Sequence, residues 1–411
     1  MDIAIPSKYA ETENESPVPP QLVGALDGVK VLDFTAVMAG PYASRMMADL
    51  GAEVVKIESL SGDQVRERPP QRNGQSSYFG HLNAGKKSMA LDLKNPNVLR
   101  AVKTMITDYD IVIENFRPGV MKRLGLDYET LSSLNPRLIY CSISGYGQTG
   151  PKSLNPAYAP IVHAASGFDK VNLHYQDDMD APAATGIFVA DVLAGTHAFG
   201  AIQAALYQRE KSQKGQYIDV SMLDAMVGML IFETQETQFP GKNRRPLYTP
   251  LKTIDDFVII APTSPRNFSK LCEVTNHTEW LTDPRFKTNA DRNANWAELF
   301  DEIETWTSKH TAEEVESILT PQGVPCSKYR ELSDVMTDPQ LLHRGTFTEI
   351  SDSSGSFKVT NPPFKMSGSR TEARNHIPDL GENSLEILKA ESQMSDESLA
   401  ELRAQKGFGK S

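Results

Sequence analysis

The alternation of strand, loop, helix and strand near the start of the chain is the feature that most constrains its fold. Gly28–Phe34 (GVKVLDF) is a short β-branched run, which predicts a buried strand. A loop, Thr35–Pro41, a helix, Tyr42–Leu50, and a second strand, Gly51–Glu58, follow it. This βαβ unit requires a parallel sheet with a right-handed crossover. The loop lacks GxGxxG, so a nicotinamide or flavin dinucleotide is not indicated.

The same pattern continues along the chain and extends the sheet. We expect further strands within Leu82–Leu93, Asp110–Phe116, Arg137–Gly147 and Gln216–Met222, with helices at Asn95–Asp108 and Val120–Leu124. Several strands end in small or polar residues, in AGP, ENF and SGYGQTG. In open α/β sheets, ligands gather at these carboxyl ends. The sequence therefore predicts a binding site at that edge of the sheet.

The character of the sequence changes near Pro240, after which GKNRRP reads as a linker. We predict a flexible tail over residues 1–25, the N-terminal part of a large domain over 26–235, a small α+β domain over 240–325, and a C-terminal part over 326–411 that returns to the large domain. The elements expected in the last two parts are a strand at Phe257–Pro262, helices at Asn295–Ser308 and Ala312–Gln322, and strands at Phe347–Ile350 and Phe357–Thr360.

Charge and cysteine usage exclude several classes of function. The net charge of −11 argues against nucleic acid or an anionic membrane as the main partner, because both need a positive face. The three cysteines, Cys141, Cys272 and Cys326, are far apart and lack CxxC spacing. They predict neither a disulfide framework nor a metal site, and they fit the reducing cytoplasm.

A long apolar stretch, Gly186–Gln208, predicts a buried helix that carries a carboxylate, Asp191, near its start. A carboxylate is rarely buried unless something pairs with it, so Asp191 is a candidate for a chemical role. Two other interpretations stay open. Polar residues interrupt the stretch, which argues against a membrane span of roughly 20 apolar residues. Asp191 could also be a structural acid that the helix dipole favours in a first turn.

Eight motifs, in this order, resemble family III CoA-transferases, the group that includes formyl-CoA:oxalate CoA-transferase, carnitine CoA-transferase and α-methylacyl-CoA racemase. The resemblance extends from about Leu26 to about Leu388 and rests on GVKVLDFTAVMAGPYAS, LGAEVVKIE, NAGKKSMALDLK, VIENFRPGVMKRLGL, LNPRLIYCSISGYGQTGP, VADVLAGTHAFGAIQAALYQREKSQKGQYIDVSM, GVPCSKYRELSDVMTDPQL and NPPFKMSGS. It implies an α/β fold with a Rossmann-like parallel sheet, a smaller α+β domain, and an interlocked homodimer.

The resemblance also implies roles for single residues. It assigns the family's nucleophile to Asp191 and contacts with CoA to Met38, Ala39, Lys86, Lys87, Asn115, Phe116 and Arg123. CoA enters as part of the substrate, and no resident cofactor is implied. CoA phosphates need cationic partners, so we expect the two lysines and Arg123 at one mouth, with Asn115 and Phe116 deeper. Without the resemblance, the three cations would be interpreted as solvated surface charges.

The sequence departs from the family in three places. Many members have a basic residue after KIE, where this chain has Ser59, so Arg66 or Arg68 could supply part of the nucleotide contact. Many transferases have a Tyr-Asp step and then a glutamine; here Ala159 stands for the Asp, after Tyr158, and His163 stands for the Gln. The glycine-rich loop of the formyl-CoA enzyme has no counterpart in LYTPLKTIDDF.

The resemblance implies transfer of CoA from an acyl-CoA, succinyl-CoA or similar, to a small carboxylic or dicarboxylic acid. Asp191 would carry the acyl group as an anhydride and then CoA as a thioester, with backbone donors such as Ser144–Gly147 facing the oxyanion. The alternative is an α-methylacyl-CoA racemase, which pairs this aspartate with a histidine. Tyr158 occupies that position here, and neither His163 nor His197 matches it. A non-catalytic acyl-CoA-binding protein is a third class.

Overall fold

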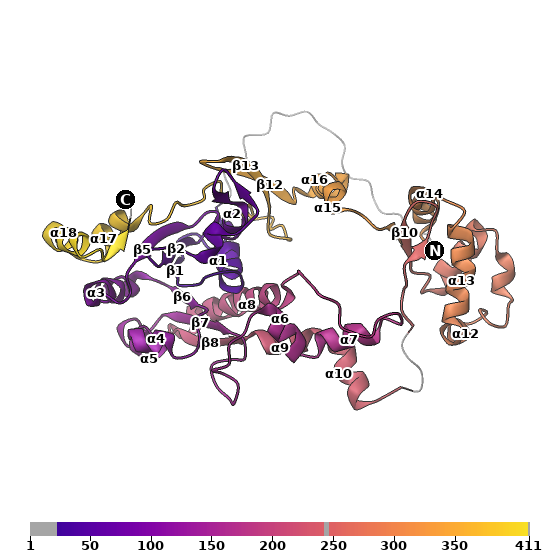
Figure 1. The fold of residues 1–411 in the computed structure, drawn as a ribbon, viewed down its shortest axis with the longest axis horizontal. Coiled ribbons are helices and arrows are strands. Elements are labelled where there is room, and N and C mark those ends of the chain that lie inside the picture. Colours follow the sequence, from indigo (N-terminus) through magenta and orange to yellow (C-terminus); the bar gives the residue numbers. More distant parts are fainter. Residues whose placement is uncertain (1–22, 242–245, 410–411) are drawn as a thin grey trace. The chain divides into compact units, whose positions relative to one another are not determined.

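The computed structural model describes residues 23–241 and 246–409 (Figure 1). These residues form two compact units. The first contains residues 23–170, 181–230 and 345–409, and the second contains the described residues of 171–180 and 231–344. Most of the predicted tail, 1–25, and most of the predicted linker lie outside the described residues.

The first unit is built on a seven-stranded sheet. Its strands, in spatial order, are β14 (Phe408–Gly409), β5 (Lys87–Leu91), β2 (Glu53–Glu58), β1 (Lys30–Asp33), β6 (Ile111–Glu114), β7 (Ile139–Ser144) and β8 (Gln216–Ser221). All neighbouring pairs are parallel except β14 with β5. The predicted α/β fold with a mostly parallel sheet is therefore confirmed.

Helices cover both faces of this sheet, because successive strand residues point to opposite sides. On β1, Val31 lies in one apolar core and Leu32 in the other. Helices α1 and α8 supply the first core, whereas α3, α17 and α18 supply the second (Figure 1). The helices of the unit are α1 (Ala39–Asp49), α2 (Ser77–Asn83), α3 (Pro96–Met105), α4 (Val120–Leu124), α5 (Tyr128–Leu134), α6 (Ala159–Ala165), α8 (Val189–Ser212), α9 (Met222–Met229), α17 (Ser384–Glu391) and α18 (Asp396–Ala404).

Shorter elements complete the first unit. They are the 3₁₀ turns η1 (Gln64–Glu67) and η2 (Ile106–Asp108), and the hairpins β3 (Gln71–Arg72) with β4 (Gln75–Ser76) and β12 (Phe347–Asp352) with β13 (Gly355–Thr360). Helix α7 (Phe168–His174) crosses the boundary between the units.

The direction of chain progression reverses between β1 and β6. From β1 the chain adds β2 and β5 on one side, and then β6, β7 and β8 on the other. The loops that leave β1 and β6 therefore diverge, and they open a crevice at the carboxyl ends of the strands. This is the edge at which the sequence predicts a binding site.

The second unit contains a three-stranded antiparallel sheet, β11-β10-β9, packed against helices. Its elements are α10 (Ile231–Gln238), β9 (Leu251–Lys252), β10 (Phe257–Ile260), α11 (Pro265–Val274), η3 (Thr278–Leu281), α12 (Asn289–Ala294), α13 (Trp296–Thr307), α14 (Ala312–Leu319), η4 (Thr320–Gln322), β11 (Cys326–Lys328), α15 (Leu332–Val335) and α16 (Pro339–Arg344). The predicted boundary at 325/326 is wrong, because β11 pairs with β10 and the chain rejoins the first unit only at Gly345.

Helix α8 differs from its prediction in two respects. It begins at Val189 rather than Gly186 and extends to Ser212. It is also not buried all round, since only 33% of its apolar 18-residue stretch is buried. Among the described residues it is the one helix whose length and composition would suffice to cross a membrane, a test that core helices of soluble proteins also pass. In this structure α8 packs against α1, α9, β7 and β8.

Candidate active site

A pocket of about 570 Å³ lies in the first unit, at the carboxyl ends of β1, β6 and β7. Its walls are the loops after these three strands, the turn η1, helix α2, and the first residues of α6 and α8. Five of the residues that the sequence singled out line it together, namely Met38, Ala39, Asn115, Phe116 and Asp191. The pocket thus brings together residues that are far apart in the sequence, since 153 positions separate Met38 from Asp191.

The Asp191 carboxylate is the chemically unusual group in this pocket. It belongs to the first turn of α8 and lies close to the backbone amide of Ala39, the first residue of α1. Burial raises the pKa of Asp191 to about 6, and the Ala39 amide partly offsets this rise. The start of a helix also favours a negative charge. Asp191 is therefore a partly desolvated carboxylate that is ionised at neutral pH.

A histidine from another helix caps the start of α8. The Nε2 atom of His163, on α6, accepts a hydrogen bond of 3.1 Å from the backbone N–H of Ala190. Phe188, the N-cap residue, provides no side-chain cap. The buried His163 ring therefore supports the backbone beside Asp191 and is not part of the pocket lining. His197 lies on the exposed side of α8.

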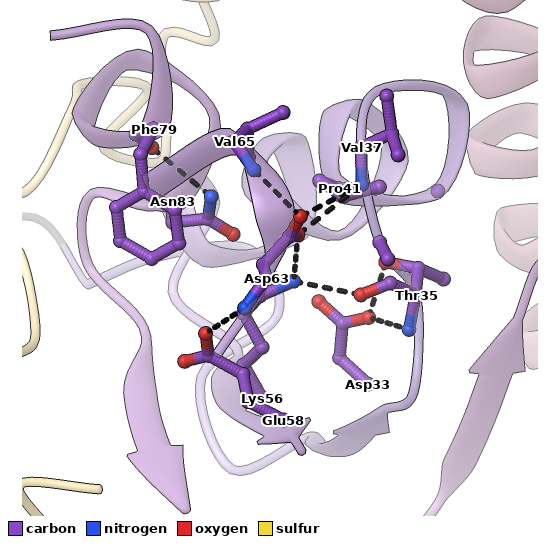
Figure 2. A network of polar contacts seen from close by, with 12 residues as sticks. Asp33, Thr35, Val37, Pro41, Lys56, Glu58, Asp63, Val65, Phe79 and Asn83 are labelled. Carbon is purple, nitrogen blue, oxygen red and sulfur yellow. Dashed lines mark hydrogen bonds and ion pairs between the residues drawn. The ribbon is translucent and has the colours of Figure 1, made fainter. Parts of the chain in front are cut away.

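Buried polar groups hold the loop after β1 in place (Figure 2). Val37 has a φ of 68°, a left-handed conformation that a β-branched residue rarely adopts. The Asp63 carboxylate accepts a hydrogen bond of 3.1 Å from the Val37 N–H, and the Lys56 ammonium donates one of 2.7 Å to the Thr35 carbonyl. Lys56 and Asp63 also form a buried ion pair of 3.1 Å. This framework fixes the backbone that carries Met38 and Ala39.

Asn115 joins the loops on the two sides of the crevice. Its Oδ1 atom accepts a hydrogen bond from the Ala36 N–H, and its Nδ2 atom donates one to the Ala36 carbonyl, both at 2.8 Å. Close packing of α8 on α1 completes the arrangement. A Cβ atom on Gly195 would lie 2.6 Å from the Ala39 carbonyl oxygen, so glycine is required for this approach. The pocket geometry is therefore rigidly specified.

The expectation that Lys86, Lys87 and Arg123 share one mouth is wrong. Lys86 is fully buried, and its ammonium lies 3.1 Å from the Asp33 carboxylate. It also donates hydrogen bonds to three further oxygens, on Ser44, Asn83 and Pro41. Burial alone would raise the pKa of Asp33, but Lys86 and Lys56 lower it to about 2. The three N–H donors of a lysine are thus occupied within the protein, which leaves none for a phosphate.

Lys87 and Arg123 lie at different places. Lys87 begins β5 and contacts Glu53, the first residue of β2, at 3.3 Å. Because the strands are parallel, these residues lie at the edge opposite the pocket. Arg123 is exposed on α4, which follows the loop after β6, on the pocket's side of the sheet. Contacts of these residues with CoA stay predictions.

The pocket also contains side-chain groups to which the sequence assigned no role. The Tyr78 and Ser144 hydroxyls are buried there and have no hydrogen-bond partner among the described residues. Arg68, which entered only as a possible nucleotide contact, lines the pocket as well, whereas Arg66 is bound to Glu58 at 2.7 Å. No periodicity or motif marks Tyr78. No cluster of three or more potential metal ligands occurs within the described ranges.

Comparison with known proteins identifies the family of the chain. Residues 26–384 match CoA-transferase family III. The chain is 34% identical over 380 residues to succinyl-CoA:glutarate CoA-transferase of Mus musculus, covering 89% of this chain and 86% of that protein. It is 36% identical over 357 residues to acetyl-CoA:oxalate CoA-transferase of Acetobacter aceti, covering 84% and 90%.

A solved structure extends the agreement to the fold. The crystal structure of a CaiB/BaiF family protein from Brucella suis matches with a TM-score of 0.78 and 31% identity, covering 91% of this chain and 100% of that one. The chain therefore belongs to CoA-transferase family III and is a CoA-transferase enzyme. This confirms the resemblance drawn from the sequence.

Proposed function

We propose that this enzyme moves CoA from a small acyl-CoA, such as succinyl-CoA, to a small mono- or dicarboxylic acid, with Asp191 as the covalent carrier. The observation that carries the proposal is the Asp191 carboxylate in the pocket wall, beside the Ala39 amide and with its pKa raised to about 6 by burial. The named activities of the relatives, succinyl-CoA:glutarate and acetyl-CoA:oxalate CoA transfer, support this substrate class.

The first half-reaction loads CoA onto the enzyme. An Asp191 oxygen attacks the thioester carbonyl carbon, the carbon–sulfur bond breaks, and CoA leaves as a thiolate. The thiolate then attacks the Asp191 carbonyl of the resulting mixed anhydride. The donor acid leaves as a carboxylate, and an aspartyl-CoA thioester remains.

The second half-reaction repeats the exchange with the acceptor acid. Its carboxylate attacks the aspartyl-CoA carbonyl and displaces the thiolate, and the thiolate then attacks the acceptor acyl carbon and frees Asp191. Each tetrahedral stage places negative charge on an oxygen, which requires donors that are already in position. The buried Ser144 hydroxyl, which has no partner within the described part of the chain, is suited to this role, as are backbone amides of the loop after β7.

The pocket composition supports transfer over racemisation. A racemase needs a second acid or base on the opposite face of the α-carbon. The pocket lining within the described residues includes no histidine, and His163 is occupied in capping α8. Tyr158 and Ala159 line the pocket where the racemases have a His-Asp pair.

A matrix of donors and acceptors tests the proposal. The purified enzyme would be incubated with succinyl-, acetyl-, oxalyl- or butyryl-CoA and with each of a series of free acids, and new acyl-CoA products would be identified by mass spectrometry. We expect a new acyl-CoA thioester in an acid-dependent manner. Hydrolysis alone, or epimerisation of a 2-methylacyl-CoA without transfer, would contradict the proposal.

The raised pKa of Asp191 predicts an acidic limb in the rate profile. The nucleophile must be ionised, so kcat/KM should fall about tenfold per pH unit below about pH 6 and level off above it. Initial rates would be measured between pH 4.5 and 8, with circular dichroism as a control for folding. A profile that stays flat down to pH 4.5 would contradict the assigned protonation state.

We further propose an interlocked homodimer in the cytoplasm. In support, several large apolar side chains of the first unit are more than half exposed, namely Leu154, Tyr158, Ile187 and Tyr207. The three cysteines are free thiols, which suits a reducing compartment. Sedimentation equilibrium should give twice the chain mass of 45.4 kDa. A monomer mass at assay concentrations would exclude the dimer.

A further inference from the structure

We propose that Arg68 binds the distal carboxylate of a dicarboxylic acyl group while the other end of that group reacts at Asp191. The inference rests on the proposed CoA transfer and specifies its substrate class. It would make Arg68 the residue that distinguishes dicarboxylic from monocarboxylic substrates on both the donor and the acceptor side.

The position of Arg68 is tied to the framework that positions the nucleophile. Arg68 directly follows η1, whose N-cap residue Asp63 accepts a hydrogen bond of 3.1 Å from the Val65 N–H. The same carboxylate accepts the Val37 N–H and pairs with Lys56 (Figure 2). The turn that leads into Arg68 and the loop that leads to Ala39 therefore share one buried anchor. Arg68 and Asp191 both line the same pocket.

Arg68 differs from Lys56 and Arg66 in having no acidic partner within the described part of the chain. Lys56 pairs with Asp63 at 3.1 Å, and Arg66 pairs with Glu58 at 2.7 Å. The Arg68 guanidinium donates a hydrogen bond of 3.3 Å to the neutral Oε1 atom of Gln64. A guanidinium has five N–H donors in a planar fork that matches a carboxylate. Most of the donors of Arg68 are thus available to a ligand.

Tyr78 links this cation to the nucleophile. Burial and the Asp191 charge raise the pKa of Tyr78, and the Arg68 charge lowers it, so the phenol lies within the electrostatic reach of both groups. Its buried hydroxyl has no partner among the described residues. A buried hydroxyl without a partner is unfavourable, and an oxygen of a bound acid would satisfy it. The pocket therefore offers a cation and a hydroxyl donor to a second carboxylate near Asp191.

Matched substrate pairs test this role, because they differ in one carboxylate and little else. Steady-state kcat/KM would be measured for succinyl-CoA against butyryl-CoA as donors, and for glutarate against valerate as acceptors. In Arg68→Gln we expect a loss of roughly 10- to 100-fold for each dicarboxylic partner, the effect of one charge-assisted contact. The monocarboxylic partners should change less than about threefold on the same scale. Arg68→Lys should restore part of the preference, since it keeps the charge without the fork.

Arg117 provides the matched comparison. It lines the same pocket from the loop after β6 and has no acidic partner in the described ranges. Arg117→Gln should leave the ratio of dicarboxylic to monocarboxylic substrates unchanged. Equal losses for both classes in Arg68→Gln, as a CoA-phosphate contact would give, overturn the proposal. So does a change of the ratio in Arg117→Gln but not in Arg68→Gln.

A binding measurement separates this proposal from the proposed transfer itself. Glutarate would be titrated calorimetrically into Asp191→Asn in the presence of CoA, with and without Arg68→Gln. We expect the Kd for glutarate to rise at least about tenfold with Arg68→Gln, whether or not the wild type transfers CoA. An unchanged Kd would overturn the role of Arg68, whereas a wild type that transfers CoA to no acid would overturn only the proposed function.

Discussion

Replacing Asp191 with asparagine is expected to reduce CoA transfer by about 10⁴-fold or more, since an amide cannot attack a thioester. The substitution keeps the side chain's shape, so the pocket at the carboxyl ends of the strands should persist and still bind acyl-CoA. Transfer would be followed by product formation, and binding by calorimetry. The matched control is Asp224→Asn, the third residue of α9 as Asp191 is of α8, which does not line the pocket.

The same substitution should not destabilise the fold. Because burial raises the folded pKa of Asp191 to about 6 from 3.8, the folded state holds the proton more tightly than the unfolded state. Stability is therefore lost as pH rises through that interval, and at neutral pH the ionised carboxylate lowers the free energy of unfolding. The substituted asparagine carries no such charge, so Asp191→Asn should melt at the same or a higher temperature than the wild type at pH 7.5. A clearly lower melting temperature would mean that the carboxylate is a structural anchor.

Replacing Lys86 with methionine is expected to lower the free energy of unfolding by about 3–5 kcal/mol, the usual effect of removing one partner of a buried ion pair. Asp33 would lose the nearer of the two cations that hold its pKa at about 2, while staying fully buried. Denaturant titration at pH 7 would measure the loss. Since the folded pKa of Asp33 is depressed, its contribution is present above about pH 4 and is lost as pH falls towards 2, so the difference between variant and wild type should shrink in acid.

Lys87→Met is the natural control, because Lys87 is the next residue but its contact with Glu53 is partly exposed. An exposed pair contributes about 0–1 kcal/mol, so this variant should be nearly as stable as the wild type. If Lys86 instead bound a CoA phosphate, Lys86→Met would raise the KM for acyl-CoA and leave stability unchanged. That outcome would contradict the structural role that its four oxygen contacts indicate.

The sequence was sufficient for the six parallel strands of the sheet, but not for the antiparallel edge strand β14 or for the start of the central helix. Strands such as β2 and β7 are buried along nearly their whole length, because both of their faces are covered, and the apolar residues concentrated in them are recognisable. The start of α8 was placed three residues early, since Ile187 and Phe188 are as apolar as the helix itself. Its actual cap comes from His163, 27 residues earlier in the chain than Ala190. No local pattern can encode a cap supplied from another helix.

Without the family resemblance, the site was predictable only where a residue is unusual in its own surroundings. Asp191 stood out because its neighbours are apolar, and the structure places it in a pocket. Lys86 and Lys87 are equivalent by sequence, yet one is buried and the other is not. The difference depends on Asp33, 53 residues away, which no spacing rule connects to Lys86. The pocket role of Tyr78 depends likewise on where α2 packs, which the residues around it do not reveal.

The most direct test of covalent transfer is to trap the intermediate on the enzyme. The wild-type enzyme would be incubated with succinyl-CoA without an acceptor, quenched with hydroxylamine, digested and examined by mass spectrometry. We predict a hydroxamate on Asp191, in the peptide that contains the start of α8, and no such product in Asp191→Asn. A modified acid at another position, or CoA transfer at an undiminished rate without any adduct on Asp191, would contradict the account.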